Sequence, residues 1–188
     1  ENVTTDGSWR TGNNMNLARR RLAGAGIQTA ALAISGTADP PLYAQVESYD
    51  GTSWTETTDV NTAREELAAA GTYTAAVAFG GKAGSATGVT EMWNGSNWTE
   101  STDLNTARQE LTGDGATNTA SIAIGGAPQR AVVELWNGSN WTETTDLNTG
   151  RSSFRGAAGT PSSALAFGGY TTTYIGTNES WNGTNWTE

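Results

Sequence analysis

Large and small apolar side chains alternate in a short stretch that occurs four times along the chain. At residues 74–81, Val77 and Phe79 alternate with alanines, and two glycines follow. This alternation predicts a strand that is buried on both faces, with small side chains on one face and large ones on the other. Similar stretches lie at residues 30–36, 120–126 and 164–169. Each follows a run of small residues that we interpret as a neighbouring strand, at residues 22–26, 67–71, 111–115 and 154–159.

A turn between two aromatic residues follows each of these strand pairs. Residues 91–100 read Glu-Met-Trp-Asn-Gly-Ser-Asn-Trp-Thr-Glu, and Asn-Gly between two β-like runs is a strong hairpin signal. The register has two alternatives. With Gly95-Ser96 at the tip, Trp93 faces Trp98, whereas with Asn94-Gly95 at the tip, Glu91 faces Trp98. Close copies lie at residues 134–143 and 179–188, and looser ones at 47–54 and 5–9.

The second tryptophan of this hairpin defines the repeat. It occupies positions 9, 54, 98, 141 and 186, so the period is 43 to 45 residues. Within each period we predict four short antiparallel strands, which we name a to d in chain order. Four strands per repeat at this period are typical of propeller blades, because a single blade cannot bury both of its apolar faces alone. A helical solenoid is the alternative, and the glycine in every copy of strand a disfavours it.

Other positions recur with the spacing of a known repeat family. An arginine lies ten residues after each of the first four of these tryptophans, strand b closes in Gly-Gly, strand c carries an aromatic residue, and a tryptophan lies a few residues further on. This pattern resembles the kelch-type repeat over essentially the whole chain, which implies a β-propeller whose arginines brace the connections between blades through backbone carbonyls. The matching residues are Arg19, Arg64, Arg108 and Arg151; Gly80-Gly81, Gly125-Gly126 and Gly168-Gly169; Tyr49, Trp93, Trp136 and Trp181; and Trp54, Trp98, Trp141 and Trp186. Ser35-Gly36 departs from the pattern, and the period is shorter than the usual kelch value of about 50.

We predict a single all-β domain over residues 1–188, a kelch-like β-propeller of four four-stranded blades plus an extra N-terminal β-hairpin. The repeats cover approximately residues 10–54, 55–98, 99–141 and 142–186, with 1–9 as a partial repeat. Because five hairpins accompany four inner-strand pairs, closure has three alternatives. Four blades close and leave the first hairpin as an appendage, the chain is part of a larger propeller, or a partner chain supplies the missing strands. Since the chain begins at Glu1, we expect it to be a mature or excised portion of something longer.

The amino-acid composition excludes several kinds of catalytic and metal-binding site. The chain has 10 basic and 19 acidic residues, a formal charge of −9, and neither His nor Cys. The missing residue types exclude thiol nucleophiles, imidazole bases and His- or Cys-ligated zinc. The acidic balance argues against binding to nucleic acid or to an anionic membrane surface, and no apolar run is long enough to span a membrane. We expect no cofactor and no partner of the nucleic-acid or membrane kind.

The carboxylates could belong to a metal site or to a glycosidase, but their pattern argues against both. The motif Asp59-Val60-Asn61 and its copies faintly resemble a calcium loop but lack its glycine and its final glutamate, so turn capping is preferred and no metal site is predicted. A pair of carboxylates could serve a glycosidase, but these residues recur in every repeat. We therefore expect hydrogen-bonded scaffold and no catalytic residue. The recurring acids before the strand c aromatic are Glu47, Glu91, Glu134 and Glu179.

Positions that differ between repeats are the candidates for binding. The b–c loops differ most in length, and the pairs after each arginine, such as Glu65-Glu66 and Ser152-Ser153, also vary. In a four-stranded meander both connections lie on the same face, so we take that face as the candidate contact surface, with neutral drift of loops as the equal alternative. The candidate ligand-binding residues are Tyr43, Lys82, Arg130, Tyr170 and Tyr174.

The resemblance also suggests a function. The near-identical copies rich in Thr, Asn and Gly look like kelch-like arrays in tail-fibre and surface proteins of marine phages and bacteria. We therefore expect a non-enzymatic adhesin, extracellular or on a virion surface, whose b–c loops bind a host surface glycan or protein. A purely structural module that packs against other copies or other virion subunits is the alternative. A carbohydrate-active enzyme domain is a third, disfavoured reading.

Overall fold

The computed structural model describes residues 12–153 and 156–188, and it confirms an all-β chain built from four four-stranded antiparallel sheets. Each sheet is a meander in which strands a to d follow one another. The predicted hairpin around Trp9 lies outside the described residues. The first two sheets comprise β1 (Ala23–Ile27), β2 (Ala30–Ile34), β3 (Val46–Tyr49) and β4 (Trp54–Thr57), then β5 (Ala68–Thr72), β6 (Ala75–Phe79), β9 (Thr90–Trp93) and β10 (Trp98–Ser101). The last two comprise β11 (Thr112–Thr117), β12 (Ala120–Ile124), β13 (Val133–Trp136) and β14 (Trp141–Glu143), then β15 (Ala157–Thr160), β16 (Ser163–Phe167), β17 (Asn178–Trp181) and β18 (Trp186–Thr187).

One small element was not predicted. The b–c loop of the second repeat forms a two-stranded hairpin, β7 (Lys82–Ala83) and β8 (Ser85–Ala86), around Gly84. Gly84 has φ +86°, and no other group lies within 4 Å of the position that a Cβ would take there. The turn is therefore exposed.

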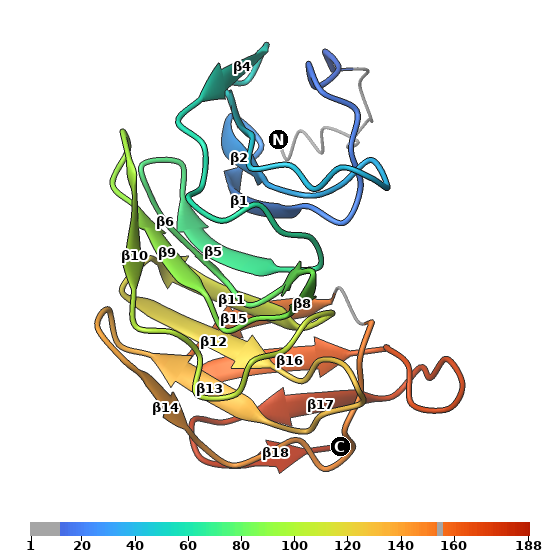
Figure 1. Cartoon of the computed structure of the whole chain (residues 1–188). Coiled ribbons are helices and arrows are strands. Elements are labelled where there is room, and N and C mark those ends of the chain that lie inside the picture. Colours follow the sequence, from blue (N-terminus) through green and yellow to red (C-terminus); the bar gives the residue numbers. More distant parts are fainter. Residues whose placement is uncertain (1–11, 154–155) are drawn as a thin grey trace, which may run out of the picture.

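The four sheets are stacked in series as an open arc. The innermost strands contact one another in the order β1, β5, β11, β15, and no comparable contact joins β15 back to β1 in the described part of the chain. Figure 1 shows the sheets fanned out from this inner side, with the first and fourth at opposite ends of the arc. The four described sheets therefore do not close into a ring.

Each junction between sheets joins a face of large side chains to a face of tryptophan and alanine. Between the second and third sheets, Val77 and Phe79 of β6 pack against Ala123, Trp136 and Trp141. Strand b therefore has one large and one small face, as predicted from the alternation. Burying one tryptophan removes roughly 150–250 Å² from water. At about 25 cal/mol per Å² this amounts to about 5 kcal/mol, an upper estimate, so these junctions hold the arc together.

The c–d hairpins adopt the first of the two predicted registers. Trp93 lies opposite Trp98, with ring centroids 5.3 Å apart. The side-chain Oδ1 of Asn94 accepts hydrogen bonds from the backbone N–H groups of Ser96 and Asn97, both at 2.9 Å, which closes the turn. The other hairpins pair Tyr49 with Trp54, Trp136 with Trp141, and Trp181 with Trp186.

The prediction that strand b is buried on both faces is wrong for the fourth sheet. Leu165 and Phe167 of β16 are 36 % and 44 % exposed, whereas the equivalent Val77 and Phe79 of β6 are fully buried. The reason is that the second and third sheets each have a following sheet, while no sheet follows the fourth among the described residues. The large face of the last sheet is therefore open.

Candidate functional site

A buried arginine–glutamate pair lies inside every sheet. In the second sheet, Nη1 of Arg64 lies 2.5 Å from Oε1 of Glu91, and both side chains are fully buried. Arg64 also donates from Nε to the carbonyl oxygen of Gly80 at 3.0 Å. The guanidinium thus links strand c to the end of strand b. The equivalent pairs are Arg19–Glu47, Arg108–Glu134 and Arg151–Glu179.

The same carboxylate anchors the connection that arrives from the preceding sheet. Oε2 of Glu91 accepts hydrogen bonds from the backbone N–H and the side-chain amide of Asn61, at 2.6 and 2.8 Å. Asn105 and Asn148 make the same contacts with Glu134 and Glu179. The asparagine of the Asp-x-Asn motif therefore caps a buried carboxylate. In residues 12–153 and 156–188 no group of three or more acidic, His or Cys side chains has a metal-binding arrangement.

Burial and hydrogen bonding oppose each other in these pairs. Burial lowers the pKa of the Arg64 guanidinium, and the hydrogen bond and charge of Glu91 only partly offset this effect. Burial raises the pKa of Glu47, but hydrogen bonds from Asn16 N–H, Arg19 and Leu17 N–H together outweigh it, so the pKa of Glu47 lies below its ordinary value. Because their oxygens are already occupied, these acids hold the sheets in shape.

The b–c loops and the d–a connections meet on one side of the arc, which we call the loop face. In each sheet one residue of the d–a connection forms a β-bridge with one residue of the b–c loop. The four bridges are Arg20 with Thr37, Glu65 with Lys82, Gln109 with Ala127, and Ser152 with Tyr170. The variable segments of all four repeats therefore share one surface.

A chain of hydrogen bonds, which we call the inter-sheet ladder, crosses this face from sheet to sheet. The N–H of Glu66 donates to the carbonyl of Arg21 at 2.9 Å, that of Glu110 to Glu66 at 3.0 Å, and that of Ser153 to Glu110 at 3.2 Å. All four residues have φ between 53° and 58°, a left-handed conformation that is uncommon outside glycine. Side chains follow the same path, since Arg21 pairs with Glu66 at 3.2 Å and Ser153 Oγ donates to Glu110 at 2.5 Å.

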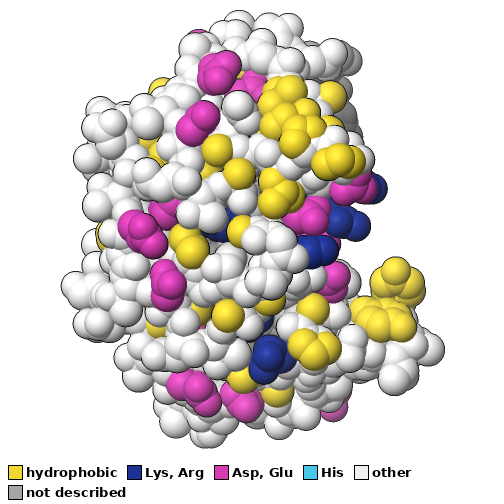
Figure 2. Space-filling model, in the orientation of Figure 1, with side chains coloured by type: hydrophobic (Ala, Val, Ile, Leu, Met, Phe, Trp, Pro, Cys, Tyr) yellow, Lys and Arg dark blue, Asp and Glu magenta, His cyan; other side chains and the backbone are white. Residues whose placement is uncertain are grey.

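Two of the predicted binding residues come together at the last junction. Tyr170 and Tyr174 form an edge-to-face pair with ring centroids 5.4 Å apart, and Tyr174 is 85 % exposed. They line an open pocket of about 350 Å³, the tyrosine pocket, together with Glu110, Gln129 and Ser153. Figure 2 shows hydrophobic side chains protruding at the loop between β16 and β17, on the edge that also carries a mixed group of acidic and basic side chains.

The other three predicted residues do not line this pocket. Lys82 lies in the second sheet, with Nζ 3.9 Å from Oε1 of Glu65. Tyr43 is half-buried, and its N–H donates to the carbonyl of Gly36 at 2.8 Å. Arg130 is half-buried too, and its carbonyl accepts a hydrogen bond from the N–H of Arg151 at 3.1 Å.

Sequence reasoning did not single out the polar side of the tyrosine pocket. Glu110 and Ser153 belong to the variable pairs that follow each arginine. The variation was visible, but individual residues could be chosen only once the last two sheets were placed side by side. Gln129 lies in the third b–c loop beside Pro128, and nothing in its own sequence context distinguished it.

The loop face carries both acidic and basic side chains, and several of them pair with one another. Burial, followed by the negative charge of Glu110, raises the pKa of Glu66, although Arg21 works in the opposite direction. A hydrogen bond to Glu65 raises the pKa of Arg21 despite partial burial. The inter-sheet ladder thus places carboxylates next to one another across a junction.

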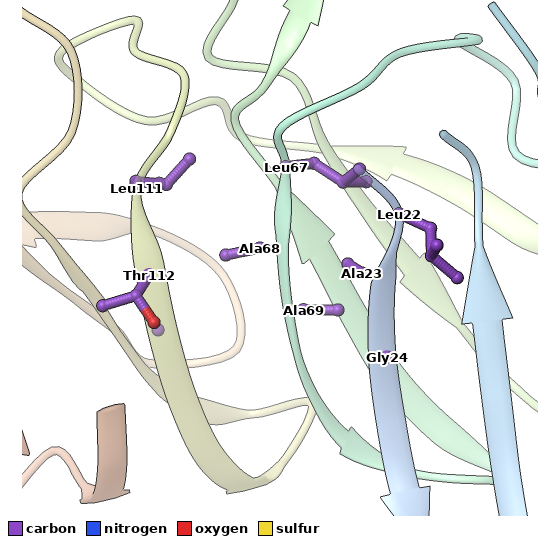
Figure 3. Close-up of a pocket in the computed structure, with 9 residues that line it drawn as sticks. Leu22, Ala23, Gly24, Leu67, Ala68, Ala69, Leu111 and Thr112 are labelled. Atoms are coloured by element: carbon purple, nitrogen blue, oxygen red, sulfur yellow. The ribbon is translucent and has the colours of Figure 1, made fainter. Parts of the chain in front are cut away.

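A second hollow lies on the inner side of the arc. It has a volume of about 210 Å³ and is bounded by strand a of the first three sheets. Figure 3 shows Leu22, Leu67 and Leu111 at corresponding places in it, above smaller residues of the same strands, namely Ala23, Gly24, Ala68, Ala69 and Thr112. The described residues that line it include no ionisable side chain, so this hollow offers no acid or base.

No protein-family model matches the chain, and a comparison with curated proteins finds no relative. The described residues contain no helix that is long and apolar enough to cross a membrane. The site therefore has to be interpreted from its geometry.

Proposed function

We propose that the chain is a recognition module without catalytic activity, and that its loop face binds a glycan or protein on the surface of a host cell. The observation that carries this proposal is the tyrosine pocket. It pairs an exposed aromatic edge with a carboxylate, an amide and a hydroxyl from Glu110, Gln129 and Ser153. Aromatic rings pack against the apolar faces of sugars or side chains, while a few polar groups fix orientation.

We further propose a kelch-like β-propeller as the parent architecture. Four four-stranded meanders in series, each with the arginine, the aromatic hairpin and the glycine stop, support it. Because the arc is open, the complete ring has more blades than these four. The resemblance to surface and tail-fibre arrays supports an extracellular or virion-surface location and an adhesive role.

The absence of catalysis is part of the proposal. The buried acids each face an arginine and recur from sheet to sheet. Among the described residues that line the tyrosine pocket, Glu110 alone carries a carboxylate. A glycosidase ordinarily requires two carboxyl groups about 5 to 9.5 Å apart across the scissile bond, so a carbohydrate-active enzyme is the weaker candidate.

Binding to glycan arrays and to whole cells tests the proposal. We expect the full chain to bind a defined set of glycans or cells, and the Tyr170→Ala/Tyr174→Ala variant to bind at least tenfold more weakly, about 1.4 kcal/mol. The matched control is Tyr73→Ala, since Tyr73 is also partly exposed but lies in the turn between β5 and β6. Unchanged binding by the double variant, or no binding by the wild-type chain, contradicts the proposal.

A structural or assembly module is the second candidate. A different observation favours it, the open large face of the fourth sheet. The two functions are compatible because they use different surfaces.

A further inference from the structure

The two ends of the arc are not alike. At each internal junction the large face of one sheet receives the tryptophan face of the next sheet, which combines the small residues of strand b with the aromatic residues of strands c and d. A series of such sheets leaves one large face at its last sheet and one tryptophan face at its first. These two faces should fit each other, because faces of the same two kinds pack together at each internal junction.

Among the described residues, no segment covers the large face of the fourth sheet. Leu165 and Phe167 are 36 % and 44 % exposed, whereas Ile122 and Ile124, their equivalents in the third sheet, are fully buried. Asn178, beside them on β17, is exposed as well. Two large apolar side chains on one sheet face thus lie open to solvent.

The tryptophan face of the first sheet is partly open. Trp54 is half-buried, whereas the equivalents Trp98, Trp141 and Trp186 are 4–6 % exposed. An open cavity of about 380 Å³ lies along this face, lined by Met15, Leu22, Ala31, Ala33 and Trp54 among others. Its lining combines the small side chains of strands a and b with the aromatic ring of Trp54. Faces of this kind receive the large side chains at the internal junctions.

The pairing of phenylalanine with glycine at an internal junction has its equivalent in the residues of the two end faces. The ring of Phe79 comes within 2.6 Å of the position that a Cβ would take on Gly113 of the next sheet, so phenylalanine there requires glycine opposite. Phe167 is the fourth sheet's equivalent of Phe79, and Gly24 is the first sheet's equivalent of Gly113. The second sheet carries Ala69 at this place, opposite the smaller Ile34 of the first sheet.

The residues of one hydrogen bond at an internal junction also have polar equivalents at the two end faces. Nε1 of Trp141 donates to Oγ1 of Thr90 in the preceding sheet at 3.0 Å. The fourth sheet's equivalent of Thr90 is Asn178, which also carries an acceptor. Trp54 of an incoming first sheet would therefore meet a hydrogen-bonding side chain.

The backbone contacts of the junctions also stop at the ends. Gly36, Gly81 and Gly126 donate to the carbonyls of Arg64, Arg108 and Arg151 of the next sheet at 2.9–3.0 Å. Gly169, the equivalent donor of the fourth sheet, has no such acceptor among the described residues. The inter-sheet ladder likewise ends at Arg21 on one side and at Ser153 on the other.

We propose that a second copy of this chain docks head to tail, with the large face of its fourth sheet on the tryptophan face of the first sheet. Leu165 and Phe167 of one copy then pack on Gly24, Ala33 and Trp54 of the other. A head-to-tail contact closes into a ring when its rotation permits. Two copies supply eight blades, within the usual range of four to eight for propellers. The inference uses the end faces and does not depend on the proposed ligand of the loop face.

Sedimentation equilibrium of the full chain tests the inference. We expect a mass twice the 19.6 kDa of the chain. Phe167→Glu and Gly24→Leu should each give monomers, and the two variants mixed should recover a dimer, because one wild-type junction remains in the pair. Both positions are exposed in the single copy, and far-UV circular dichroism verifies the fold of each variant. Tyr73→Glu, in the second sheet, is the control that leaves the mass unchanged.

Three outcomes overturn the inference. A wild-type monomer at micromolar concentration shows that a second copy does not cover the end faces, and flanking repeats of a longer chain then become the better occupant. A series of ever larger species shows that the contact does not close at two copies. A mixture of the two variants that stays monomeric shows that the contact is not head to tail.

Discussion

The arginine of each repeat satisfies three needs at once. It neutralises a buried glutamate, donates to backbone carbonyls at the end of strand b, and fixes the start of strand a. The sequence predicted the carbonyl contacts from the family resemblance but did not predict the glutamate partner. The two residues are 26 to 28 positions apart, and only the meander of strands b and c brings them together.

Removing the charge of one buried glutamate should destabilise the fold. Glu134→Gln leaves the buried Arg108 guanidinium without its counter-charge, and we expect a loss of about 3 kcal/mol in the free energy of unfolding. Urea unfolding measures it. Glu143→Gln is the matched control, because Glu143 lies directly opposite Glu134 on β14 but is exposed. Equal effects of the two changes would mean that the buried pair is not a main source of stability.

Glu66 should make stability fall with rising pH. Its pKa in the folded chain lies above its ordinary value of 4.5, chiefly because of burial, so the folded state holds this proton more tightly than the unfolded state. Its contribution is fully present below about pH 4.5 and is lost as the pH rises through the folded pKa. Glu66→Gln cannot ionise, so the difference in unfolding free energy between variant and wild type should grow in favour of the variant over that window.

Glu47 should make stability fall with falling pH, the opposite of Glu66. Hydrogen bonds that outweigh burial lower its folded pKa, so its contribution is present above its ordinary value of about 4.5 and is lost as the pH falls through the folded pKa. Denaturant unfolding of both Gln variants between pH 3 and 7 compares the two. A pH-independent difference for Glu66→Gln contradicts the role given to its burial.

Strands and hairpins were the most predictable elements. The apolar alternation located strand b in all four repeats, and Asn-Gly, or Asp50-Gly51 in the first sheet, located the four described c–d hairpins. The register of the hairpin could not be decided from the turn residues alone. It is decided by the aromatic pair and by the Asn94 side chain, which caps two N–H groups.

Glycine on strand a is required where a large side chain of the preceding sheet packs against it. In Gly113→Ala the new Cβ would meet the carbonyl of Ile122 at 2.4 Å and the ring of Phe79 at 2.6 Å. We expect a loss of about 1–3 kcal/mol from overpacking, measured by urea unfolding. Gly176→Ala is the control, because nothing lies within 4 Å of its Cβ position, and a comparable loss there would show that glycine flexibility rather than packing decides.

At the scale of the whole molecule, the repeat predicted the number of sheets but not the shape of the stack. The number of sheets follows from the period of 43 to 45 residues, which is visible in the sequence. Whether four sheets close depends on the geometry of the junctions between them, and no single repeat contains a whole junction. The loop face was predicted as a surface, while the tyrosine pocket could not be foreseen because it lies between two repeats.

The open arc with complementary ends is the central claim, and the inter-sheet ladder offers its most direct test. The chain has no cysteine, so cysteines can be introduced singly. If a second copy continues the ladder, Ser153 of one copy lies beside Arg21 of the other, as Ser153 lies beside Glu110 within a copy. The Glu66→Cys/Glu110→Cys variant is the internal control and should form its disulfide within one chain, since the ladder joins these residues directly.

The measurement is mild oxidation of the Arg21→Cys/Ser153→Cys variant followed by non-reducing electrophoresis. The account predicts a disulfide-linked pair of chains, formed readily by the double variant and not by either single variant. Chains that stay unlinked while the internal control oxidises fully, or single variants that link equally well, would contradict it.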